Sequence, residues 1–129
     1  MDTLLKPTLY TPDGALLGGR CPCGHVFFPM QGHGCEVCGR HGADLKPMTL
    51  AGRGKLLSST VVHLHADKAR TAPFTVGKIA LADGPVVRTL LVDTVQQIAP
   101  GTEMATALVP VGIGDDGTTI LDLRFRPER

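Results

Sequence analysis

Four cysteines are the residues whose type and spacing point most directly to chemistry. They form two pairs, Cys21-x-Cys23 and Cys35-x-x-Cys38, and a glycine follows each pair. Two short turns that each present two thiolates are typical of a zinc ribbon, because zinc favours four tetrahedral ligands. Four thiolates leave no coordination position open for water. We therefore predict that these cysteines bind one structural zinc ion.

Other uses of the cysteines are less consistent with the sequence. A redox Cys-x-x-Cys normally begins a helix in a βαβ unit, and the sequence predicts no such unit. Ligand count alone leaves an iron–sulfur centre open. Three histidines, His25, His33 and His41, lie in the same region, where one of them could replace a cysteine. We expect them to be exposed loop residues, because four cysteines already complete the shell.

Two further histidines, His63 and His65, share one face of a predicted strand with Val61. Such a pair can bind a metal or relay a proton. No third ligand stands nearby, so a solvated sheet face is the favoured interpretation.

The segment Gly52-Arg53-Gly54-Lys55 opens the first long apolar run. Its glycines would let the backbone approach a ligand, and the cations Arg53 and Lys55 are suited to phosphate. It is too short for a P-loop. On spacing alone, a tight turn with solvated charges is favoured.

Residues 112–117 match the letters of the dinucleotide fingerprint Gly-x-Gly-x-x-Gly. That motif needs a helix after it, whereas a strand is predicted here, so we interpret these residues as a hairpin loop. The sequence also contains neither a Gly-x-Ser-x-Gly elbow nor a His-Glu-x-x-His motif. Its acidic residues are scattered, and a closed zinc site exposes no Lewis acid. We therefore predict no catalytic residues.

Composition narrows the class of protein further. The 129 residues suit one compact domain or two small modules, and 43% hydrophobic with 19% charged residues is a globular balance. Lys plus Arg number 13 against 12 Asp plus Glu, so the net charge is only +1. A charge this small provides no strong field for nucleic acid or an anionic membrane.

The sequence shows no targeting signal and no apolar run near the roughly 20 residues that span a bilayer. We therefore expect a soluble, cytoplasmic protein. In that reducing compartment, clustered cysteines favour metal binding over disulfides.

The chain divides into three predicted parts. Residues 1–20 form an irregular lead-in, broken by prolines and by Asp13-Gly14. Residues 21–48 form the zinc ribbon, which has too few large apolar residues for a core of its own, so metal binding replaces core burial. Residues 50–127 form an OB-fold.

The third part is predicted to be mainly β. Its five apolar runs are bounded by turn residues and cover 55–65, 74–82, 86–92, 104–111 and 118–126. Within the second run the alternation changes phase, which a bulge at Gly77 would reconcile. The longer link 93–101 is expected to carry a short helical turn capped by Asp93 or Thr94. This pattern favours a five-stranded Greek-key barrel of the OB type.

The combined motifs resemble the family called "domain of unknown function 35". The resemblance runs from about residue 17 to 127 and rests on these segments, in this order: Gly19 to Pro29 (GRCPCGHVFFP), Gly34 to Gly39 (GCEVCG), Gly52 to Gly54 (GRG), Pro73 to Gly77 (PFTVG) and Phe125 to Pro127 (FRP).

This resemblance implies a rubredoxin-like zinc ribbon, with Cys21, Cys23, Cys35 and Cys38 as ligands, joined to an OB-fold. Family members are associated with acyl-CoA chemistry. Many are small, non-catalytic partners of thiolase-like enzymes or thiolase-fold aldolases and help to shape the acyl-CoA site. The chain departs from the family in its shorter first cysteine pair and its short lead-in.

Two functions of different class follow. The first is a non-catalytic accessory subunit of a thiolase-like enzyme in a hetero-oligomer. In it, Arg53 and Lys55 are candidate contacts to the phosphates of a coenzyme A thioester at a shared site, or to the partner. The alternative is a single-stranded nucleic-acid binder, since zinc ribbons and OB-folds recur in that class. The low charge and scarce aromatic residues argue against it.

Overall fold

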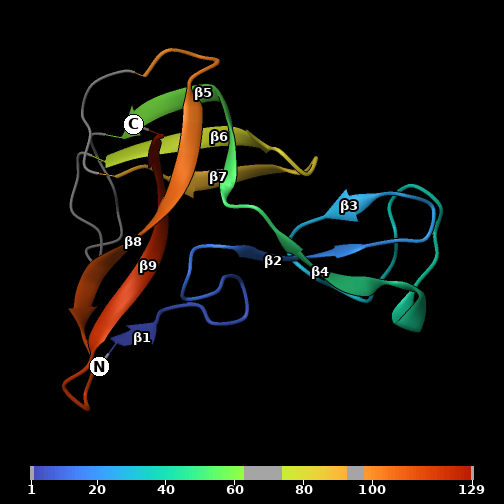
Figure 1. Cartoon of the computed structure of the whole chain (residues 1–129), viewed down its shortest axis with the longest axis horizontal. Coiled ribbons are helices and arrows are strands. Elements are labelled where there is room, and N and C mark those ends of the chain that lie inside the picture. Colours follow the sequence, from blue (N-terminus) through green and yellow to red (C-terminus); the bar gives the residue numbers. More distant parts are fainter. Residues whose placement is uncertain (1, 63–73, 93–97, 129) are drawn as a thin grey trace.

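The computed structural model describes residues 2–62, 74–92 and 98–128, and these form two β-sheets joined by a short link (Figure 1). The elements are β1 (Asp2–Leu4), β2 (Leu16–Arg20), β3 (Val26–Phe27), the 3-10 helix η1 (Gly42–Asp44), β4 (Lys46–Leu50), β5 (Arg53–Val62), β6 (Phe74–Leu81), β7 (Val86–Leu90), β8 (Glu103–Ile113) and β9 (Thr119–Pro127). The predicted fold class, a mainly β chain with a four-cysteine ribbon and an OB-fold, is confirmed.

The larger sheet has the strand order β1-β9-β8-β5-β6-β7 and is strongly curled. A parallel bridge between Leu91 and Phe125 joins the end of β7 to β9, and the backbone N–H of Val92 donates to the carbonyl of Phe125 at 2.9 Å. This closure gives five strands, β5 to β9, the connectivity of an OB-fold. They correspond to the five predicted runs. The helical turn predicted for the link was to be capped by Asp93 or Thr94, and residues 93–97 lie outside the described residues.

The smaller sheet has the order β3-β2-β4 and forms the base of the cysteine ribbon, which projects to one side of the barrel (Figure 1). The lead-in predicted to be irregular contains two strands, and this corrects that expectation. Strand β1 pairs in parallel with β9, and β2 belongs to the ribbon sheet. Both strands are short, and neither shows an alternation long enough to read from sequence.

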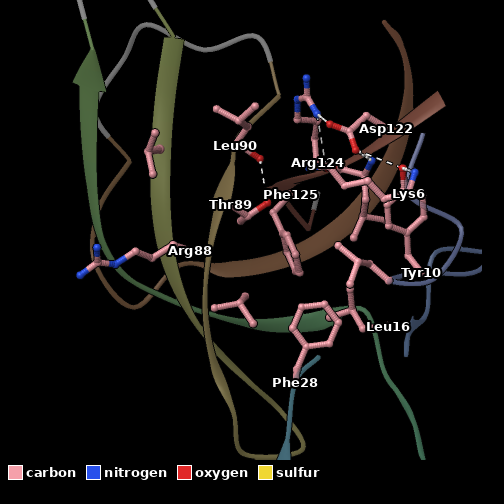
Figure 2. Close-up of a pocket in the computed structure, with 14 residues that line it drawn as sticks. Lys6, Tyr10, Leu16, Phe28, Arg88, Thr89, Leu90, Asp122, Arg124 and Phe125 are labelled. Carbon is pink, nitrogen blue, oxygen red and sulfur yellow. Dashed lines mark hydrogen bonds and ion pairs between the residues drawn. The ribbon is translucent and has the colours of Figure 1, made fainter. Parts of the chain in front are cut away.

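One apolar core unites the barrel with the base of the ribbon. Leu16 and Leu50 come from the ribbon sheet and are buried, at 2% and 0% exposure. They share a cluster with Leu56 and Phe125 of the barrel, and Figure 2 shows Leu16 and Phe28 beside Phe125. The remaining buried members of this core are Tyr10, Ile79, Leu81, Leu91 and Met104. The two sheets therefore fold as one packed unit.

The bulge predicted at Gly77 lies instead on the neighbouring strand. The register between β5 and β6 shifts between Leu56 and Ser58, while β6 itself keeps one phase. In β6 the buried positions are Thr75, Gly77, Ile79 and Leu81. Gly77 fits this inner face because a Cβ there would lie 2.9 Å from the Leu91 side chain. The apparent change of phase arose because a small and a polar residue occupy buried positions.

A tight junction fixes the ribbon against the barrel at Gly52. Its carbonyl accepts the backbone N–H of Thr106 at 2.9 Å, and the Thr106 hydroxyl donates to the carbonyl of Gly14 at 2.7 Å. The neighbouring Ala51 N–H donates to the carboxylate of Asp83 in the β6–β7 turn, at 2.8 Å. Among the described residues, no helix is long and apolar enough to cross a membrane.

Replacing Gly52 with alanine should test this junction. The added Cβ would lie 2.3 Å from both the Gly14 carbonyl oxygen and the Thr106 hydroxyl, so the chain must shift. We expect Gly52→Ala to lower the free energy of unfolding by about 1–3 kcal/mol in denaturant titration. Gly32→Ala is the control, because its Cβ would meet nothing within 4 Å. Equal stability of the two variants would contradict the tight junction.

Candidate metal centre

Two tight turns present the four cysteines. In the first, the Cys21 N–H donates to the His25 carbonyl at 2.9 Å, and the Gly24 N–H donates to the Cys21 carbonyl at 2.8 Å. In the second, the Gly39 N–H donates to the Cys35 carbonyl at 2.8 Å. Gly24 and Gly39 have φ of 102° and 84°, the left-handed region that glycine tolerates best. The glycine after each cysteine pair is therefore what allows each turn to close.

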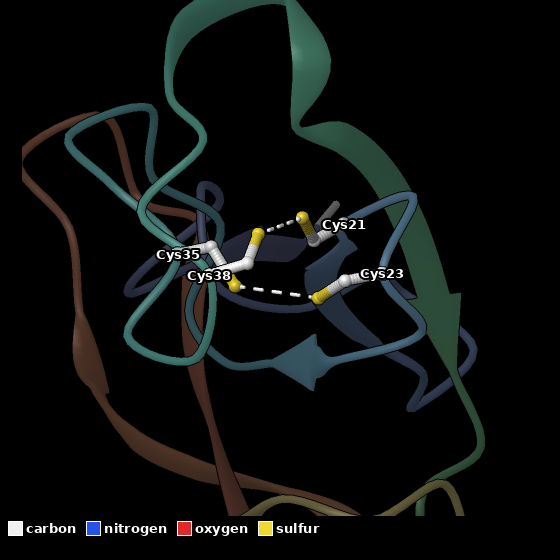
Figure 3. Close-up of side chains that lie close together, drawn as sticks. All are labelled: Cys21, Cys23, Cys35 and Cys38. Carbon is white, nitrogen blue, oxygen red and sulfur yellow. Dashed lines mark hydrogen bonds between the residues drawn. The ribbon is translucent and has the colours of Figure 1, made fainter.

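The two turns bring all four sulfur atoms together (Figure 3). The Sγ atoms all lie within 4.8 Å of one another, with Cys21 and Cys38 3.4 Å apart and Cys23 and Cys35 3.7 Å apart. A tetrahedron with Zn–S bonds of about 2.3 Å has sulfurs about 3.8 Å apart. The donor set and its spacing thus fit a four-thiolate zinc ion, and four soft thiolates suit zinc or iron rather than hard cations. The predicted ligands converge, and zinc as their occupant stays a prediction.

The backbone around the second turn favours thiolate. Burial raises the pKa of the Cys35 thiol, but hydrogen bonds from the backbone N–H groups of Cys38 and Val37 and from the side chains of Cys23 and Cys21 lower it, and the result is about 6. For Cys23, the backbone N–H of His25 lowers the pKa, while burial and the neighbouring cysteine sulfurs raise it to about 11. A bound cation would stabilise the thiolate forms of both Cys23 and Cys35.

Arg40 adds a positive charge beside the sulfurs. Its hydrogen bond to Cys21, followed by the charges of Cys38 and Cys21, raises the pKa of the Arg40 guanidinium. A cation at this position offsets part of the net negative charge of a zinc ion with four thiolates. Sequence reasoning missed Arg40, although it stands two residues after Cys38, where the second turn ends.

The histidines of this region are not ligands in the described structure, where the metal-competent group consists of cysteines alone. His33 and His41 are exposed, as expected. His25 is half-buried at 25% side-chain exposure, and its Nε2 lies 3.0 Å from the Glu36 carboxylate. His63 and His65, the other histidine pair, lie outside the described residues.

The candidate phosphate contacts Arg53 and Lys55 lie on the barrel, at the start of β5. Both side chains are about two-thirds exposed, at 66% and 65%. Arg53 pairs with Glu128, and the Lys55 ammonium lies 3.7 Å from the carboxylate of its cross-strand neighbour Glu103. Surface ion pairs of this kind are worth little, so a ligand can replace them. Their role in coenzyme A binding stays a prediction.

The fold and the cysteine cluster define a class: a four-cysteine ribbon joined to an OB-fold. Comparison with known proteins supports the OB-fold. Residues 48–109 match the family model "ChsH2, C-terminal OB-fold domain". A chain of the solved structure "Ltp2-ChsH2(DUF35) aldolase" is similar with a TM-score of 0.67 and 26% identity, covering 89% of this chain and 86% of that one.

Two curated relatives carry the family name DUF35, which also stands in the name of that solved structure. A "DUF35 domain-containing scaffold protein" from Pyrococcus furiosus is 28% identical, over 87% of this chain and 82% of the relative. One of the same description from Methanocaldococcus jannaschii is 29% identical, over 87% and 81%. The predicted resemblance to the domain of unknown function 35 family is therefore confirmed.

Removing one cysteine should remove the metal. We expect the purified chain to carry about one zinc per molecule by elemental analysis, and Cys35→Ser to lose most of it. The ribbon of that variant should unfold at lower temperature, because structural zinc contributes on the order of 10 kcal/mol to such small folds. His33→Ala is the control and should keep both zinc and melting curve. Full zinc content with an unchanged melting curve in Cys35→Ser would refute the assignment.

Proposed function

We propose that this chain is a non-catalytic, zinc-containing accessory subunit of a thiolase-like or thiolase-fold aldolase enzyme that acts on acyl-CoA. The observation that carries the proposal is the likeness to a chain of the Ltp2-ChsH2(DUF35) aldolase, which extends over both ribbon and barrel. The word scaffold in the names of both archaeal relatives supports an assembling role.

The cysteine cluster supports a structural role for the ribbon. A four-thiolate zinc has no open coordination position, so it neither activates water nor polarises a carbonyl. In this proposal the metal holds the ribbon in shape, and the partner supplies the catalytic residues. The chain then contributes surface to the complex and to the site that receives the coenzyme A thioester.

The far end of the barrel offers a surface suited to that partner. Strands β8 and β9 extend beyond the rest of the sheet as an arm, with β1 alongside (Figure 1). Three exposed apolar side chains lie on or beside this arm: Val111 at 43% and Ile113 at 70% on β8, and Leu5 at 46% just after β1. Exposed apolar groups on neighbouring segments mark protein contacts when they form one patch. We assign this apolar arm to the partner enzyme.

Affinity purification of the tagged chain from its native cells tests the proposal. We expect a thiolase-fold enzyme to co-elute in stoichiometric amount. Ile113→Asp should reduce its recovery at least tenfold, because it places a charge in an apolar contact. Val86→Asp is the matched control, since Val86 is 50% exposed but lies in β7, away from the arm. Co-elution of nucleic acid, or of no enzyme, would contradict the proposed function.

A second measurement addresses the coenzyme A contact. In the reconstituted complex, the double variant Arg53→Ala, Lys55→Ala should weaken acyl-CoA binding by about tenfold, because each cation provides a charge-assisted contact to phosphate. Lys78→Ala, which removes an exposed lysine from β6, is the control. If assembly and acyl-CoA affinity are both unchanged in the double variant, these residues have no such role.

A further inference from the structure

A cavity of about 310 Å³ lies between the lead-in, β7 and β9 (Figure 2). Much of its wall is apolar, and Leu16, Phe28, Leu90 and Phe125 are among its large members. For comparison, an apolar cavity of about 150 Å³ is enough to hold benzene. This space is twice as large and suits a chain of roughly ten carbon atoms, within the lower range of natural ligand sites.

One end of the cavity is polar. There Asp122 and Arg124 form an ion pair, although their side chains are only 9% and 17% exposed. The Tyr10 hydroxyl lies 3.1 Å from the Asp122 carboxylate and 3.1 Å from the Leu121 carbonyl, and it accepts the Lys6 backbone N–H at 3.1 Å. Burying an ion pair gives little or no net stability compared with apolar residues. The pair is therefore a candidate for function rather than for folding.

Two cations at this end have unused donors. Within the described part of the chain, the hydrogen bonds of Arg124 all run from Nη1, to Asp122 and to the Leu123 carbonyl, which leaves its other N–H groups available. The Lys6 ammonium makes no ion pair with any described residue, and Lys6 lines the cavity. A third cation, Arg88, extends away from the other labelled side chains (Figure 2).

The charge balance at the polar end indicates what kind of group would bind there. Asp122 is matched by Arg124 and by the donor Tyr10, whose pKa is raised by burial and by the Asp122 charge, so that its hydroxyl keeps its proton at neutral pH. Among the residues that the structure describes, Lys6 then remains without a counter-charge. A ligand with an acceptor oxygen and negative charge would complete the set, whereas a cation would be repelled.

We propose that this cavity binds a medium-sized apolar carboxylate, with its hydrocarbon part against Leu16, Phe28 and Phe125 and its carboxylate beside Lys6 and Arg124. This site is separate from the cysteine cluster and borders the apolar arm, because Lys6 follows Leu5 and the polar end is built on β9. It goes beyond the proposed accessory role, because it would give the chain a ligand of its own.

Titration calorimetry with matched probes tests the site on the full chain. Decanoate should bind at least tenfold more tightly than decanol, because only decanoate presents a charge to Lys6 and Arg124. Lys6→Ala should weaken decanoate about threefold or more and leave decanol unchanged. Lys46→Ala removes an exposed lysine of β4 in the ribbon sheet, and this control should change the affinity for neither decanoate nor decanol.

A variant that fills the space gives an independent check. Thr89 lines the cavity from β7, and Thr89→Phe should abolish binding of both probes while the melting temperature is retained. The proposal is overturned if the native chain binds neither probe, or binds both equally. It is also overturned if Thr89→Phe disrupts co-elution of the partner enzyme while the native chain binds no decanoate, since the cavity would then seat a partner side chain.

Discussion

The apolar core shared by ribbon and barrel is the constraint on which the rest of the structure depends. Leu50 ends the ribbon sheet and is fully buried, and Leu56 follows it into the barrel only a few residues later. Both pack with Met104 and Phe125, which come from the far end of the chain. A barrel of five short strands has little interior, and the ribbon base adds to it. The base of the ribbon and the barrel are therefore expected to unfold together.

The cysteine turns lie outside this core and need a different source of stability. Their own buried cluster consists of Cys21, Phe27, Cys35 and Leu45, with Met30 packed against it. So few apolar groups cannot offset the entropy of ordering two turns. A metal bound by the four converging thiols would supply the missing free energy, and Arg40 would offset part of the negative charge of the thiolates. Apolar burial therefore stabilises the base of the ribbon, and the predicted metal would stabilise the cysteine turns at its tip.

The sequence predicted those features whose signal is local. Cysteine spacing and the glycine after each pair located the metal-competent cluster, and alternation located the five barrel strands. Pairings between distant segments left no such signal. The hydrogen bond from Tyr10 to Asp122, which also pairs with Arg124, joins residues more than a hundred positions apart. The alternation around Gly77 was misread because Thr75 and Gly77, a polar and a small residue, occupy buried positions. The extra residue lies on the neighbouring strand, at Leu57.

The junction at Gly52 restricts the movement of the ribbon relative to the barrel. The Gly52 backbone is hydrogen-bonded to Thr106, the space around Gly52 leaves no room for a side chain, and the Ala51 N–H donates to Asp83 in the β6–β7 turn. A hinge would let ribbon and barrel swing independently, but this geometry fixes the angle between them. In any assembly that contacts both ribbon and barrel, the fixed angle would set the relative orientation of the two contact surfaces. The chain would then orient its partners as well as bind them.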